Sequence, residues 1–188
     1  MSRKTPEALR GQARTLADAA AAAGRWFRRP EPAALSGART ARLRARGWRG
    51  AAVVALKGGR GPAKDGAADF SFALGEAVES AVQAVSDAAL WGLGADAEFA
   101  AAAEALRDGA KALVRAAEAS GEERAEALIE AKRFAADVER RRRAEIRAAA
   151  ESPFFVDGVK RAEIAGRLSA SAESLQQACD ALAGSLGE

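Results

Sequence analysis

The side chains best suited to bind a ligand are arginines that lie near two tryptophans in the first third of the chain. The candidate contacts for an anion are Arg25, Arg28, Arg29, Arg39, Arg42, Arg46 and Arg49, and Trp26 and Trp48 are the candidate aromatics of a partner-facing surface. Guanidinium groups pair with phosphate oxygens, and indole rings settle at the headgroup level of membranes. The mixture predicts contact with an anionic membrane surface, with nucleic-acid phosphates, or with acidic residues of the same chain if the tryptophans pack inward.

Charge is divided unevenly along the 188 residues. Residues 1–65 hold 15 Lys/Arg and 4 Asp/Glu, whereas residues 66–188 hold 14 Lys/Arg and 22 Asp/Glu. The net charges are +11 and −8, and the whole chain carries +3. Such a division predicts a basic arm that either has its own partner or folds back on an acidic body.

The residues of common enzymes are missing. There is no histidine, so a histidine-based catalytic triad or metal site cannot form, and no Walker or dinucleotide-binding glycine motif is present. Cys179 is the single cysteine and lies at a helical core spacing, which predicts a small buried side chain. The chain is therefore predicted not to be an enzyme.

Composition and periodicity predict an all-α protein. Alanine dominates, and the residues favoured in strands are scarce. Apolar spacing predicts helices over 6–23, 33–57, 69–92, 96–119, 122–151 and 159–186, with Gly24 ending the first and Asp96 capping the fourth. The short loops favour an antiparallel up-down bundle, in which 66–188 form a four-helix body and 1–65 a partly helical basic arm, joined near a glycine-rich linker at 58–62.

Location is predicted from what the sequence lacks. No apolar run approaches the roughly 20 residues of a membrane span, and a secretory signal is not apparent. We expect a cytoplasmic protein, which the basic arm could hold at the periphery of the inner membrane.

Three stretches resemble a known family. They are 130–141, on a predicted helix that contains Asp137, then 151–155, which contain a Ser-Pro-Phe corner, and 161–168, which contain the acid-Ile pair Glu163-Ile164. In this order they resemble the PhoU-like family, most closely the branch associated with Pit-type phosphate transporters. The resemblance extends over about residues 70–186 and implies a helical bundle that regulates phosphate transport by docking on a protein partner such as a phosphate permease.

The resemblance also implies where a metal would bind. Family members hold metal ions, often iron clusters, with pairs of acidic residues on the bundle surface. Asp137 and Glu173 match the second acid of each pair, whereas Arg133 and Ser169 occupy the first positions. A divalent metal or iron bound by Asp137 and Glu173 is the cofactor that the family would imply, and the residues alone predict none.

Two classes of function remain open from the sequence. The first is a non-enzymatic regulator of phosphate transport. The second is a nucleic-acid-binding or structural interaction protein that uses a helical bundle with a basic arm, for which nucleic acid is the less favoured partner. Self-association into a homo-oligomer is a further hypothesis, because an alanine-rich seam allows identical helices to pack closely.

Overall fold

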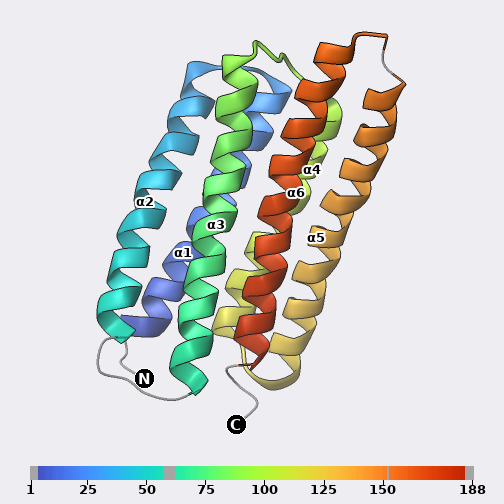
Figure 1. Ribbon diagram of the computed structural model, residues 1–188. Helices are drawn as coiled ribbons and strands as arrows, with labels where there is room; N and C mark the ends of the chain where they lie inside the picture. Colours follow the sequence, from blue (N-terminus) through green and yellow to red (C-terminus); the bar gives the residue numbers. More distant parts are fainter. Residues whose placement is uncertain (1–3, 57–61, 152, 185–188) are drawn as a thin grey trace.

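The chain folds into six α-helices (Figure 1). The computed structural model describes residues 4–56, 62–151 and 153–184, and in these ranges it contains no β-strand. The helices are α1 (Lys4–Arg28), α2 (Pro32–Leu56), α3 (Pro62–Leu90), α4 (Ala97–Glu118), α5 (Gly121–Ala150) and α6 (Phe155–Gly184). Successive helices run in opposite directions in Figure 1, so the predicted all-α, up-down bundle is confirmed.

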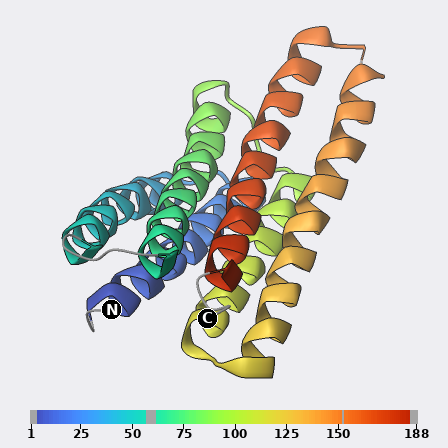
Figure 2. The same ribbon diagram turned by 60° about the horizontal axis from the view of Figure 1, so that its bottom comes forward.

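Each half of the chain forms a three-helix unit. Helices α1, α2 and α3 all pack against one another, and so do α4, α5 and α6. The two units meet along two seams, α1 against α4 and α3 against α6, which can be followed in Figures 1 and 2. In the described residues α3 and α4 make at most marginal contact although they are consecutive, because α1 lies beside α4 instead.

The connection between α3 and α4 explains this arrangement. It turns at Gly92, whose positive φ of 67° suits a residue without a Cβ. The Asp96 N–H then donates a hydrogen bond of 2.6 Å to the carbonyl oxygen of Phe27, at the end of α1. The connection is thus tied to α1, and α4 starts against α1 rather than against α3.

Small side chains set the spacing of the core. Many of the fully buried residues are alanines, and the larger ones include Phe27, Phe70, Leu74, Leu106 and Leu175. At Gly109 of α4, an added Cβ would lie 2.8 Å from Leu175 Cδ2 and 3.3 Å from the carbonyl oxygen of Ala131. Helices α4, α5 and α6 therefore approach so closely at this point that no side chain fits, as expected for a core poor in large residues.

The prediction that Gly24 ends the first helix is wrong. Helix α1 continues to Arg28, and Gly24 lies inside it, 3.9 Å from Ala103 Cβ when a Cβ is added. Phe27 is fully buried, and its ring centroid lies 5.3 Å from that of Phe99. Burial of this last turn outweighs the weak helix propensity of glycine. The helix ends at Arg28, two residues before Pro30, because a proline disfavours helical geometry in the residue that precedes it.

The other predicted boundaries are close to the observed ones, with two exceptions. Helix α3 begins at Pro62 instead of residue 69, and α6 begins at Phe155 instead of residue 159. Asp96 caps α4 as predicted, since its Oδ1 accepts hydrogen bonds from the N–H groups of Glu98 and Phe99 at 3.0 and 2.9 Å. The predicted linker at 58–62 lies outside the described residues except for Pro62.

The division into an arm at 1–65 and a body at 66–188 stays a prediction about domains. The structure adds that the described part of the arm is helical and packs on that body. Helix α1 contacts α3 and α4, helix α2 contacts α3, and buried residues of α1 and α2 belong to the same hydrophobic core as those of α3–α6.

Candidate functional site

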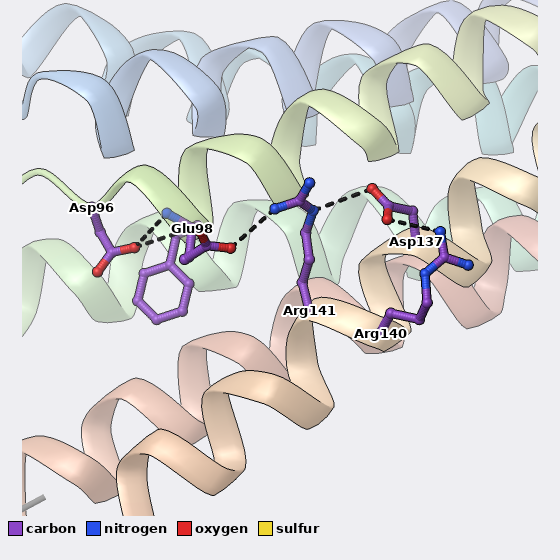
Figure 3. Close-up of polar contacts among 6 residues, drawn as sticks. Asp96, Glu98, Asp137, Arg140 and Arg141 are labelled. Carbon is purple, nitrogen blue, oxygen red and sulfur yellow. Dashed lines mark hydrogen bonds and ion pairs between the residues drawn. The ribbon is translucent and has the colours of Figure 1, made fainter.

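Asp137, one of the two candidate metal ligands, is held by arginines. It lies on α5, where Oδ1 accepts a hydrogen bond from Arg140 Nη2 at 2.9 Å and Oδ2 accepts one from Arg141 Nε at 3.2 Å (Figure 3). Arg141 also donates from Nη1 to Glu98 Oε2 on α4 at 3.0 Å. Both oxygens of Asp137 are thus engaged by cations, which would repel a metal ion.

Glu173, the other candidate ligand, lies elsewhere. It is exposed on α6, on the wall of a surface groove of about 470 Å³ between α5 and α6. Asp137 is not among the residues that line this groove. Among the described residues there is no group of three or more His, Cys, Asp or Glu that could hold a metal ion. Because hard cations need several oxygen ligands brought together, Asp137 and Glu173 do not fit a metal site.

Glu139 is the centre of the polar cluster in the same groove. Its carboxylate accepts hydrogen bonds from the Ser169 hydroxyl at 2.5 Å, from Arg143 Nε at 3.0 Å and from Arg142 Nη1 at 3.2 Å. The Ser169 hydrogen bond, with the two guanidiniums, lowers the pKa of Glu139 below its ordinary value, and burial opposes this only in part. The run of arginines at 140–143 is therefore paired with acids of its own helix, as the three- and four-residue spacings predict.

Arg161 forms a connection among three helices that the sequence did not predict. It lies on α6, pairs with the buried Glu145 of α5, and pairs through Nη1 with Asp96 Oδ2 at 2.6 Å. Its guanidinium also lies 5.0 Å from the ring centroid of Phe99. The cavity beside this cluster is only about 10 Å³, the size of a single water. The cluster therefore joins helices and leaves no room for a substrate.

Four of the seven candidate anion-binding arginines are paired with carboxylates. The pairs are Arg28 with Glu104, Arg29 with Glu31 at 3.0 Å, Arg42 with Glu79 at 2.9 Å and Arg49 with Glu76 at 3.8 Å. Arg25, Arg39 and Arg46 have no carboxylate within ion-pair distance in the described part of the chain, and all three are exposed. The basic segment is thus neutralised in part by carboxylates of α3 and α4. Arg25, Arg39 and Arg46 keep a positive charge that no carboxylate among the described residues compensates.

The two candidate aromatics differ in their surroundings. Trp26 is 9% exposed and belongs to the hydrophobic core, so it does not form a partner-facing surface. Burial of its ring follows from the continuation of α1 through residue 28. Trp48 is partly exposed, lies over Gly11 of α1, and borders a groove of about 550 Å³ between α1 and α2.

The largest group of exposed apolar side chains lies where α5 and α6 meet. This α5–α6 corner comprises Phe154 (69% exposed), Phe155 (80%), Val156 (62%) and Val159 (52%). It stands at one end of the bundle, beyond the last turn of α5 (Figure 1). The sequence places a Ser-Pro-Phe corner at 151–155, but whether its apolar residues face the core or the solvent could be learned only from the packing.

No protein-family model and no characterised protein sequence matches this chain. None of the six helices, over their described residues, has the length and apolar character needed to cross a bilayer. The geometry defines an all-α bundle whose polar clusters, where described, consist largely of ion pairs and which exposes four apolar side chains together at the α5–α6 corner.

Proposed function

We propose that this protein is a non-enzymatic regulatory protein that docks on a protein partner through the α5–α6 corner. The observation that carries the proposal is the exposure of Phe154, Phe155, Val156 and Val159 together. Exposed apolar groups of this kind mark interaction sites, and aromatic side chains are the commonest anchors in protein interfaces. The resemblance to PhoU-like regulators passes through this corner and favours a phosphate permease as the partner.

The backbone holds the corner in place. Gly158, in the first turn of α6, lies so close to the end of α5 that an added Cβ would be 2.7 Å from the carbonyl oxygen of Ala149. The N–H of Gly158 donates a hydrogen bond of 3.0 Å to the carbonyl oxygen of Phe154. A surface held in this way loses little conformational entropy on binding, which favours affinity.

Catalysis receives no comparable support. The carboxylates of Asp137, Glu139 and Glu145 are each bound to arginines. Cys179 is buried, and burial raises the pKa of its thiol to about 12, so it is neither accessible nor ionised. We place the protein in the cytoplasm, on the side of the membrane where it can reach the inner face of a permease.

The test is phosphate regulation in the organism that encodes the protein. Deletion of the gene is expected to alter phosphate uptake under phosphate excess, and the wild-type chain is expected to restore it. Phe155→Asp with Val156→Asp should fold but fail to restore regulation, because carboxylates on an anchor surface oppose burial. Ile129→Asp is the matched control, since Ile129 is also an exposed aliphatic residue of α5 outside the corner. An unchanged phosphate response after deletion would refute the proposal.

A further inference from the structure

The outward side of α2 is a second exposed surface with a different chemistry. It carries two arginines, Arg39 and Arg46, among three aliphatic residues, Leu43 (67% exposed), Val53 (54%) and Val54 (66%). These five residues are called the α2 face. Over the residues that the structure describes, helix α2 has extensive contacts with α1 and α3 alone, and it forms one edge of the bundle, at the left in Figure 1. The α2 face therefore runs along an open side of the molecule.

The charge of α2 is one-sided. The helix contains five arginines and no acidic residue. Three of these arginines pair with acidic residues of neighbouring helices. Arg42 binds Glu79 of α3 at 2.9 Å, and Arg44 binds Asp18 of α1 at 3.3 Å. Arg49 likewise reaches Glu76 of α3 at 3.8 Å. Arg39 and Arg46 are left without a carboxylate among the described residues, so the outward side alone keeps uncompensated positive charge.

We propose that the α2 face binds the surface of a bilayer containing anionic phospholipids. A helix that lies in the headgroup region needs cationic side chains for the phosphates and aliphatic side chains that enter the acyl boundary. Arg39 and Arg46 supply the first and Leu43, Val53 and Val54 supply the second, from one side of one helix. Nucleic acid would explain only the arginines, because phosphates gain nothing from exposed leucine and valine.

The inference rests on the proposed function in one respect, since a regulator of a permease acts at a membrane. The two surfaces are nevertheless separate, because α2 has no extensive contact with α5 or α6 in the described residues. With protein-free vesicles there is no permease to dock on, and a difference in binding between wild type and a variant of α2 reports on the α2 face. A negative result with vesicles would therefore refute the proposal for the α2 face without bearing on docking through the α5–α6 corner.

The experiment measures co-sedimentation of the full chain with vesicles of phosphatidylcholine alone and of phosphatidylcholine mixed with phosphatidylglycerol. Arg39→Gln with Arg46→Gln removes the charges, and Leu43→Ser with Val54→Ser removes aliphatic groups without changing charge. Arg133→Gln with Arg147→Gln is the control, because it removes two exposed arginines of α5 and gives the same net charge. Circular dichroism confirms that each variant is folded.

The wild type is expected to bind the anionic vesicles and not the neutral ones. Its binding to the anionic vesicles should weaken as the salt concentration is raised. The α2 arginine variant should bind about tenfold more weakly, since each arginine near such a surface contributes on the order of a tenfold change or less. The control should bind within about twofold of wild type. The aliphatic variant should bind about fivefold more weakly, because buried apolar area strengthens interfacial binding.

Three results would overturn the proposal. One is equal binding of the wild type to neutral and anionic vesicles, and another is equal loss in the α2 arginine variant and the α5 control. The third is tight binding to duplex DNA that displaces the vesicles and is unaffected by Leu43→Ser with Val54→Ser, which would assign the α2 face to nucleic acid.

Discussion

Gly11 of α1 lies directly beneath the indole ring of Trp48 of α2. A Cβ on residue 11 would be 2.7 Å from both Cδ2 and Cζ2 of the ring, well inside the separation at which carbon atoms attract. The contact brings the two basic helices together at a point where only a hydrogen atom fits. It also fixes the position of α2, whose only extensive partners in the described residues are α1 and α3.

Replacing Gly11 by alanine should therefore destabilise the protein. Overpacking against a ring costs about 1–3 kcal/mol, and the better helix propensity of alanine returns about 0.5–1 kcal/mol. We expect the free energy of unfolding in urea to fall by about 1–2 kcal/mol. Gly47→Ala and Gly50→Ala in α2 are matched controls, since nothing lies within 4 Å of a Cβ added at either position. Both controls should stabilise slightly, and stabilisation by Gly11→Ala as well would show that the ring does not constrain residue 11.

The helices themselves follow from the sequence, because alanine content and apolar spacing act locally. The order of the helices in space does not. Periodicity shows that α3 has a buried face, but not that α6 and α1 cover it while α4 lies against α1. In that arrangement the start of α4 is tied to α1 by the hydrogen bond from the Asp96 N–H to the Phe27 carbonyl oxygen, between residues whose separation along the chain gives no pattern.

Arg161→Met should cost more stability than most surface changes, because it leaves the buried carboxylate of Glu145 without its cation. We expect a loss of about 2–3 kcal/mol in the free energy of unfolding. Adding Glu145→Gln to this variant should recover part of the loss, because the uncompensated charge is removed. Arg115→Met breaks an exposed pair with Glu130 and should cost at most about 1 kcal/mol. Equal losses for Arg161→Met and Arg115→Met would contradict the role assigned to Glu145.

Ser169→Ala should weaken the dependence of stability on pH. The pKa of Glu139 is lowered in the folded state, mainly by the Ser169 hydroxyl. The ionised carboxylate therefore adds stability above its unfolded pKa, and this contribution is lost as pH falls through the lower folded pKa. The variant should be less stable than wild type by about 1 kcal/mol at neutral pH, with the difference shrinking in acid. Urea unfolding at several pH values measures this, and a difference independent of pH would exclude the proposed coupling.

Cys179 should react with a thiol reagent only when the bundle opens. Its side chain is fully buried, and burial raises the pKa of the thiol to about 12. We expect the rate of labelling in native buffer to be lower by about 10³-fold or more than in denaturant, as for a core group that requires extensive unfolding. A rate close to that of the denatured chain would show that the seam of α6 is open.

Some ion pairs of the polar clusters can be predicted from the sequence and others cannot, as with the helices and their order in space. The pairs of Asp137 and Glu139 with the arginines at 140–143 follow from spacing along one helix. The pairing of Arg161 with Glu145 and Asp96 could not be predicted, because it joins three helices whose rotation is set by the core. Likewise, the position of Trp26 among arginines leaves open whether it faces a partner or packs inward, and it is buried because α1 extends further than Gly24.

Photocrosslinking from the α5–α6 corner tests the central claim most directly. A photoreactive phenylalanine analogue at position 155, introduced into the full chain in cells of the encoding organism, should form a covalent product with a phosphate permease. The same analogue at position 129, on the exposed side of α5, should not form it. A permease product from position 155 alone is the predicted result. The absence of that product, or equal amounts from positions 155 and 129, would contradict docking through the corner.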